Sequence, residues 1–398
     1  MLLFAIATLC PFLLIAAAIA WGGIWAWGSL AFLTLLAFSL DRLAPEEIEN
    51  APPDAEFPAS NNLLVLLGLS HLAILPLSVW AVAGQSGLSL LDRAVIAVAV
   101  SILLGQISHP VAHELIHKST RSKHLLGQLV YSSMLFGHHA SAHLRVHHVY
   151  VGNDADPNSA RLGESFYSFV LRTWPAGFMA GLHAENRLRK GQPLVQHPYV
   201  LYLTVASAVI IGAYVGAGLP GLSALVVIAI YSQLQILMSD YVQHYGLRRY
   251  ALADGRLEPI GPQHSWNAPH WFTSAMTLNA PRHSDHHMAP SRPYPALQLD
   301  EDKMPCLPYS LPVMAGIALV PPFWRRVMDA RCLRWHPVWT EPTQVTSRDI
   351  PPAVLAHAKS GSVPRAVLAV SEHANTHPDP AHDRHRNDRA VRRPDDGG

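Results

Sequence analysis

The chain has 398 residues, of which 50% are hydrophobic and only 14% are charged, whereas charged residues make up about a quarter of a soluble domain. The net charge of +1 gives no electrostatic reason to expect a nucleic-acid partner. The three cysteines, Cys10, Cys306 and Cys332, form no C-x-x-C pair. That spacing argues against a disulfide framework, a cysteine-based zinc site and an iron–sulfur cluster.

Six apolar segments are long enough to cross a bilayer, which takes a helix of about 20 residues. The predicted spans are residues 2–21, 24–40, 63–82, 94–111, 200–218 and 222–238. No charged residue precedes Asp41, and a cleaved signal peptide is the weaker explanation of this stretch, because it lacks a basic start and is too long. Tryptophans and glycines over residues 21–28 predict a turn near a membrane interface. The shorter apolar runs 125–136 and 311–323 predict re-entrant, interfacial or core helices.

Basic residues indicate how the spans are oriented. Lysines and arginines crowd the segment between spans four and five and the segment after span six, whereas the connectors 84–92 and 218–221 hold none. The positive-inside rule therefore places both basic segments in the cytoplasm. From about Glu341 the hydrophobic periodicity is lost, and the last residues are rich in His, Asp, Arg and Pro. We expect an all-α membrane-embedded domain over residues 1–337 and a disordered cytoplasmic tail over residues 338–398.

Three histidine clusters lie beside the spans, on the predicted cytoplasmic side. They comprise His113 and His117; His143, His147 and His148; and His283, His286 and His287. Histidines three or four residues apart share a helix face and can converge on one ion. We expect His244, at the end of the last span, to be a further contributor. Polar groups at membrane depth usually mark a functional site, and imidazole suits iron, zinc, copper or nickel.

The nine imidazoles are too many for one ion, since a zinc ion takes three or four ligands, and they fit two ions. This number favours oxygen chemistry at two metal ions over hydrolysis at one zinc. Three acids, Asp156, Asp240 and Asp285, are candidates to orient a ligand ring through its other nitrogen, although each suits a cap or turn equally well. Nearby histidines are expected to be hydrogen-bonded buried rings instead of ligands; these are His109, His138, His139, His264 and His270.

These motifs resemble those of the integral-membrane non-haem diiron proteins related to membrane fatty acid desaturases, and most closely the alkane 1-monooxygenases. The resemblance covers about residues 1–335. Its motifs are His113-Glu-Leu-Ile-His117-Lys118, His143-x-x-x-His147-His148, His244-Tyr-Gly246-Leu247, Arg282-His283-Ser-Asp-His286-His287, Asp156-Pro-Asn-Ser-Ala-Arg161, His264-Ser-Trp-Asn267 and Pro321-Pro-Phe-Trp324. It implies six spans in a bacterial inner membrane, with a cytoplasmic site where the nine histidines bind two iron ions. It also implies that electrons come from a rubredoxin fed by a reductase. This chain has no C-x-x-C-G pair, so we expect the rubredoxin to be a separate protein.

Four positions depart from the pattern of that family. Ala142 stands where a Glu is usual, Val146 where a small residue is usual, Gln243 where a Glu is usual, and Asp240 where an Asn is usual. The ligand positions are intact, so we expect the metal site to be retained. Substrate choice and the surroundings of the ligands are where these changes would act.

The resemblance suggests a monooxygenase that uses O₂ to convert the terminal methyl of a medium- or long-chain n-alkane into a primary alcohol, with no catalytic residue beyond the metal ligands. Alternatives are a hydroxylase of another methyl-bearing hydrocarbon or fatty acyl substrate, a desaturase, and a zinc protease using His113-Glu114-x-x-His117. A non-enzymatic metal transporter or sensor would need polar residues along the spans. A predicted cytoplasmic basic face comprises Arg145, Arg187, Arg189, Lys190, Arg248 and Arg249. It would suit docking of an acidic redox protein, or it reflects only the orientation of the spans in the membrane.

Overall fold

The computed structural model describes residues 1–43, 49–52, 55–250, 252 and 256–335. Every regular element in these ranges is a helix, and an isolated β-bridge joins Asn267 to Cys306. The expected tail over residues 338–398 lies outside the described residues.

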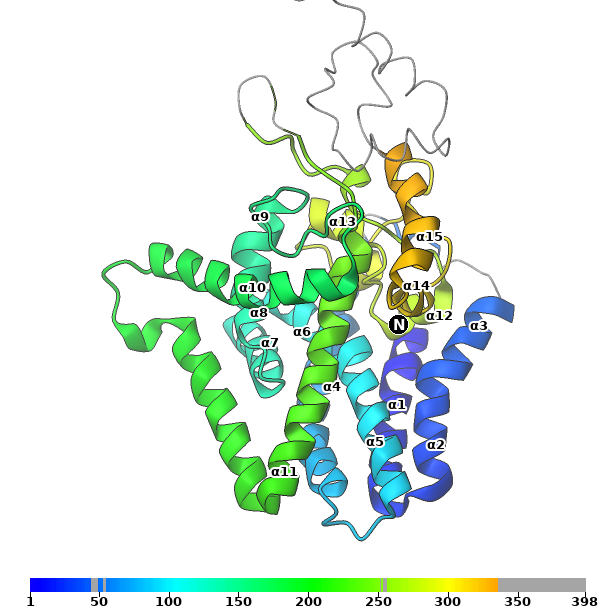
Figure 1. Cartoon of the computed structure of the whole chain (residues 1–398), viewed down its shortest axis with the longest axis vertical. Helices are drawn as coiled ribbons and strands as arrows, with labels where there is room; N and C mark the ends of the chain where they lie inside the picture. Colours follow the sequence, from blue (N-terminus) through cyan, green and yellow to red (C-terminus); the bar gives the residue numbers. More distant parts are fainter. Residues whose placement is uncertain (44–48, 53–54, 251, 253–255, 336–398) are drawn as a thin grey trace, which may run out of the picture. The chain divides into compact units, whose positions relative to one another are not determined.

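Five helical segments are long and apolar enough to cross a membrane. They are α1 (Leu2–Trp21); α2 (Gly23–Ala31), which continues through the π-helical η1 (Phe32–Leu36) into α3 (Ala37–Leu43); α4 (Pro58–Val82); α5 (Leu90–Leu103), which continues through the π-helical η2 (Leu104–Ser108) into α6 (His109–Ile116); and α11 (Pro198–His244). These segments make the chain an integral membrane protein, and they appear together in the lower part of Figure 1.

The longest segment, α11, has 47 residues and is two helices joined by a sharp bend. Ala217 leaves the helical conformation, and Gly218 adopts φ 62° and ψ −150°, a combination essentially restricted to glycine. Figure 1 shows the result as a V with two long arms. The two arms correspond to predicted spans five and six, so the structure agrees with the six membrane segments expected from the sequence.

The predicted turn over residues 21–28 is too long. Only Gly22, at φ 62°, separates α1 from α2, and Trp25 and Trp27 lie within α2. The side chain of Asp92 explains the early start, because its Oδ1 accepts a hydrogen bond from the Gly23 amide at 2.8 Å. A carboxylate at a helix N-terminus satisfies amides that otherwise have no partner.

The other helices gather at the end of the spans where the histidines lie, in the upper half of Figure 1. They are α7 (Arg121–Ser133), α8 (His138–Ala142), η3 (His143–His147), α9 (His148–Tyr150), α10 (Phe166–Leu188), η4 (Leu194–Gln196), η5 (Pro262–His264), α12 (Trp271–Met276), α13 (His283–Met288), η6 (Tyr294–Ala296), α14 (Leu311–Ala318) and α15 (Pro321–Arg334). The run 125–136 falls largely in α7, which packs on α6 and α4. The run 311–323 is divided between α14 and the start of α15.

Candidate metal centre

The nine histidines singled out by their spacing converge in two groups, within each of which one nitrogen from every ring lies within 4.8 Å of the others. One group is His113, His117, His143, His148 and His286, and the other is His147, His244, His283 and His287. Their elements are far apart in the sequence: the end of α6, the turn η3 with α9, the end of α11, and α13. The convergence therefore depends on how the helices at the histidine-bearing end of the spans pack over them.

The middle cluster is divided by an unusual helical turn. Residues His143–His147 form a π-helix, in which residue i aligns with residue i+5 and not i+4. His143 and His148 consequently face each other, with their Nε2 atoms 2.9 Å apart, while His147 points into the other group. The simple i, i+4 pairing expected for His143 and His147 is thus replaced by an i, i+5 pairing.

The third cluster is divided as well, but by ordinary helical geometry. His283 and His287 lie one turn apart on α13, with Nε2 atoms separated by 3.1 Å, and belong to the same group. His286 lies on another face of α13, and its Nε2 is 3.1 Å from that of His148. Segments 143–148 and 283–287 each contribute to both groups.

The distances between the ring nitrogens, and the absence of hydrogen-bond partners for several of them among the described residues, fit bound metal ions. Two ligands at right angles on an ion with bonds of about 2.1 Å lie about 3 Å apart, and the Nε2 atoms of His244 and His283 are 2.9 Å apart. The Nε2 atoms of His113, His117 and His147 are buried and have no hydrogen-bond partner among the described residues. Imidazole nitrogens without thiolate or carboxylate in the set suit iron, zinc, copper or nickel.

Burial also keeps most of these rings in the neutral form that binds metals. Desolvation lowers the pKa of His283 to about 3 and that of His117 to about 3. Burial, together with the neighbouring imidazoles, holds the pKa of His286 and of His287 well below the usual range. A neutral imidazole offers its lone pair to an ion without first losing a proton.

His147 differs from the other rings because it has a carboxylate partner. Its Nδ1 donates a hydrogen bond to Asp156 Oδ2 at 2.8 Å. Burial lowers the pKa of His147, but the carboxylates of Asp156 and Asp240 together outweigh this effect and raise that pKa above its usual value. Asp156 is held in turn by the Ser159 hydroxyl at 2.7 Å and the Asn158 amide at 3.0 Å. This arrangement fixes the proton on Nδ1 and directs Nε2 to the histidine group.

The other two acids predicted to orient ligand rings have different partners. Asp285 pairs with Arg292 and accepts a hydrogen bond from the Gln298 amide at 2.9 Å. Asp240, buried in the last turns of α11, accepts a hydrogen bond from the Asn158 side chain. Asn158 therefore ties Asp240 to the loop that carries Asp156, a link across 82 positions that no local sequence pattern signals.

The five neighbouring histidines expected to be hydrogen-bonded rings lie outside both groups. Nδ1 of His109 is 2.9 Å from the Tyr131 hydroxyl, and Nε2 of His264 is 3.1 Å from the Glu258 carboxylate. His139 stacks on Phe136, and its buried Nε2 has no hydrogen-bond partner among the described residues, so the expected hydrogen bond is missing at that nitrogen. The remaining two are His138, which meets Phe136 edge-on, and His270, at the start of α12.

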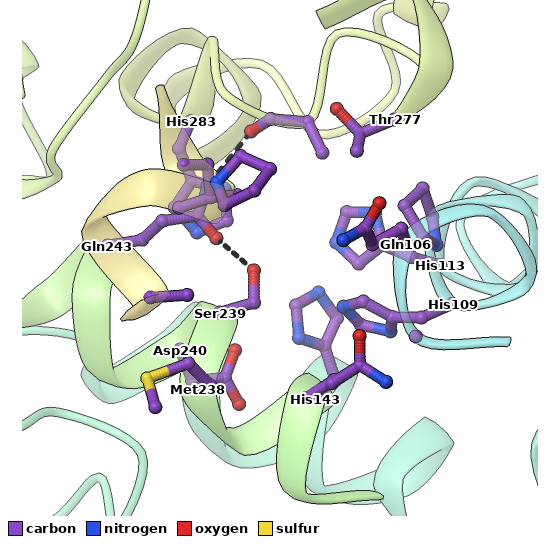
Figure 2. Close-up of a pocket in the computed structure, with 17 residues that line it drawn as sticks. Gln106, His109, His113, His143, Met238, Ser239, Asp240, Gln243, Thr277 and His283 are labelled. Carbon is purple, nitrogen blue, oxygen red and sulfur yellow. Dashed lines mark hydrogen bonds between the residues drawn. The ribbon is translucent and has the colours of Figure 1, made fainter. Parts of the chain in front are cut away.

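A cavity of about 90 Å³ opens onto both histidine groups (Figure 2). His113 and His143 of the first group and His283 of the second line it. The rest of its wall comes from η2, α11, α14 and the residues before α13, and it includes Gly105, Gln106, His109, Gln235, Met238, Ser239, Thr277, Leu311 and Ala315. Apart from His109, these residues were not singled out in the sequence, because a cavity wall built from distant segments has no signature of spacing.

The departures from the expected motifs have structural roles of their own. Gln243 lines the cavity, where its Oε1 accepts a hydrogen bond from Ser239 Oγ at 2.8 Å and its Nε2 donates to the Ala280 carbonyl at 3.0 Å. Figure 2 shows both bonds. Ala142 and Val146 are buried beside the middle cluster. Metal binding by the nine rings, and the effect of these departures, remain predictions.

Comparison with known proteins identifies the relatives of this chain. The family model of the fatty acid desaturases matches residues 92–314. An alkane 1-monooxygenase of Ectopseudomonas oleovorans is 32% identical, over 79% of this chain and 82% of the relative. Alkane 1-monooxygenase 2 of Pseudomonas aeruginosa is 30% identical, over 74% and 79%. The xylene/toluene monooxygenase hydroxylase component of Pseudomonas putida is 26% identical, over 86% and 90%. The chain therefore belongs to the fatty acid desaturase family and, within it, to the alkane 1-monooxygenases.

Proposed function

We propose that this protein is a diiron monooxygenase of the inner membrane that hydroxylates the terminal methyl group of medium- or long-chain n-alkanes to primary alcohols. It uses O₂ and electrons from a separate rubredoxin, which a reductase keeps reduced, and its site faces the cytoplasm. The observation that carries the proposal is the position of the two histidine groups: both border one small cavity at the end of the membrane-spanning helices.

The size and lining of the cavity support oxidation at a chain end. A cavity of about 90 Å³ is small beside a long hydrocarbon, so only the end of such a chain enters. Met238, Leu311 and Ala315 supply the apolar part of the wall, and Gly105 and Gln235 line the cavity from the membrane-spanning helices. The remainder of the substrate would lie among the spans, where an alkane is already dissolved.

Different residues of the chain would have different roles in the proposed reaction. Bound iron ions would supply the activation of O₂ and the oxidising power. The nine imidazoles hold the ions, and Asp156 keeps the proton of His147 on Nδ1. The Ser239–Gln243–Ala280 hydrogen bonds fix one wall of the cavity, so that the methyl group meets a rigid surface. The apolar wall excludes water from the reacting end.

Two alternative functions are less well supported by these contacts. In a zinc protease of the His-Glu-x-x-His type, Glu114 would act as general base, but here its carboxylate forms an ion pair with Lys118 at 3.1 Å. That alternative also leaves seven rings of the two groups without a role. A hydroxylase of aryl methyl groups is the closer rival, because a xylene/toluene monooxygenase component is among the relatives.

Metal content and product analysis test the proposal. The purified protein, reconstituted in lipid, is expected to bind two iron ions per chain, and the His286→Ala variant is expected to bind fewer. Glu56→Ala, at an exposed position, is the matched control and should keep both ions. With n-octane or n-hexadecane, O₂ and a reducing system, gas chromatography should detect the 1-alcohol.

Three other results would each indicate a different function for this chain. One zinc ion per chain would replace the proposal by the hydrolytic one. Two iron ions with an alkene product would indicate a desaturase. Two iron ions with benzylic alcohol from xylene, and no product from n-alkanes, would indicate an aryl-methyl hydroxylase.

A further inference from the structure

Helix α15 has one buried aromatic and apolar face and one exposed cationic face. Trp324, Met328 and Cys332 follow one another at intervals of four residues, and all are buried. Arg326 and Arg334 are eight residues apart on the opposite side, and both are exposed, as is Arg325. In Figure 1, α15 rises beyond α14 at the same end of the spans as α13, which carries three of the clustered histidines.

The arginines of α15 have no carboxylate partner in the described part of the chain. The basic residues considered earlier as a docking face behave differently. Arg145 and Arg189 both pair with Glu185. Arg248 pairs with Asp154. The charge of that first face is therefore partly neutralised by ion pairs, whereas the arginines of α15 form no such pair with a described carboxylate.

The buried face of α15 contacts the residue that follows a clustered histidine in the chain. Trp324 is fully buried and packs edge-on against Tyr245, with ring centroids 5.2 Å apart. Tyr245 follows His244 in the chain, and its hydroxyl donates a hydrogen bond to Asp329 of α15 at 2.7 Å. Its carbonyl accepts a hydrogen bond from Trp266 Nε1 at 2.9 Å. These contacts hold Tyr245 in one orientation against α15, and its backbone is bonded directly to His244.

We propose that α15 is the docking surface for a small acidic one-electron carrier, and that Trp324 and Tyr245 form the aromatic bridge through which its electron reaches the metal ions at His244. This inference rests on the proposed function and deepens it by assigning where the donor binds. In each transfer, the carrier is oxidised by one electron and the metal centre is reduced by one, with no bond made between the proteins. Two transfers, two protons, O₂ and the hydrocarbon balance to alcohol and water.

Charge and packing together favour such a carrier over a lipid headgroup as the occupant. Anionic headgroups would explain exposed arginines at a membrane-side helix, but not an aromatic contact between that helix and a residue bonded to His244. Complementary charge steers a carrier to its site and is weakened by salt. The aromatic rings shorten the insulating path that the electron must cross.

The experiment uses the full-length, iron-loaded protein in nanodiscs of zwitterionic lipid, with purified rubredoxin as the probe. Binding is measured by biolayer interferometry at low and high salt. Electron transfer is measured anaerobically by stopped flow, from the absorbance of reduced rubredoxin as it is oxidised by the ferric protein. The variants are Arg326→Glu/Arg334→Glu on the exposed face of α15 and Trp324→Phe on its buried face. The matched control is Arg187→Glu/Lys190→Glu, an equal charge change at exposed positions near the end of α10.

The α15 double variant is expected to raise the Kd for rubredoxin about tenfold at low salt, with a smaller effect at high salt. The α10 control should leave the Kd unchanged. Trp324→Phe should leave the Kd unchanged and slow electron transfer several-fold at saturating rubredoxin. Reduction by a small chemical reductant, which needs no docking, should proceed at the same rate in all four proteins.

Equal effects of the two double variants, or no effect of either, would overturn α15 as the docking surface. An unchanged transfer rate in Trp324→Phe would overturn the aromatic bridge. An α15 effect that appears only in nanodiscs with anionic lipid would assign the arginines to headgroups instead. Hydroxylation by the chemically reduced protein reports on the proposed function alone, so its failure is distinguishable from a failure to dock.

Discussion

Replacing Asp156 by Asn isolates the contribution of one carboxylate to the stability of the metal centre. Its oxygens accept hydrogen bonds from His147 Nδ1, the Ser159 hydroxyl and the Asn158 amide. An amide keeps the size of the side chain but removes the charge, and a hydrogen bond to a charged group contributes about 1.5–3 kcal/mol. Removal of a ligand's outer partner typically costs about 10–100-fold in metal affinity, or about 1.4–2.8 kcal/mol. The two ranges agree.

We therefore expect the Kd of the ion held by His147 to rise about 10–100-fold in Asp156→Asn, with the ion of the other group less affected. Equilibrium dialysis against chelator-buffered ferrous iron, followed by metal analysis, would show one ion leaving before the other. Asp41→Asn is the control, because this buried carboxylate bonds to the backbone amides of Phe272 and Thr273 and to no clustered histidine. Wild-type iron affinity in Asp156→Asn, or an equal loss in Asp41→Asn, would refute the reasoning.

Three further substitutions test the cavity and the fold. Met238→Ala enlarges the cavity, so gas chromatography of the alcohols should show a larger subterminal fraction; an unchanged ratio would remove Met238 from the wall that positions the chain end. Gly218→Ala forces a side chain into a glycine-only conformation at φ 62° and should destabilise the protein by about 1–3 kcal/mol in thermal unfolding, whereas Gly212→Ala, at an open helical position, should not. Gln243→Glu sets a carboxylate oxygen against the Ala280 carbonyl, 3.0 Å from Nε2 in the wild type, and should lower stability by about 1–3 kcal/mol; an unchanged melting temperature would contradict that contact.

The spans could be predicted from the sequence because length and apolarity alone decide them. The break between spans five and six was also foreseeable, since Gly218 and Pro220 interrupt a long apolar run. The turn after α1 was overestimated, because Asp92, from a distant segment, caps α2 directly at Gly23. Such a cap depends on tertiary packing, which local composition does not report.

The nine histidines that converge could likewise be chosen from their spacing, but their division into two groups could not. That division depends on the π-helical turn at His143–His147, for which the residues carry no recognisable signal. The hydrogen-bond and ion-pair partners of the three acids could not be predicted from the sequence either. The position of Asp285 between two histidines suggested that it orients a ligand ring. Its carboxylate is instead bound by Arg292 and by the Gln298 amide.

The π-helical turn has a consequence for how the centre assembles. Because residues 143–148 supply rings to both groups, and residues 283–287 do the same, neither group can be ordered without partly ordering the other. The first ion to arrive would meet most of the entropic cost of fixing these two segments, and the second would bind to a prearranged set of nitrogens. Iron uptake should therefore be cooperative, with chains carrying a single ion scarce at every stage of loading.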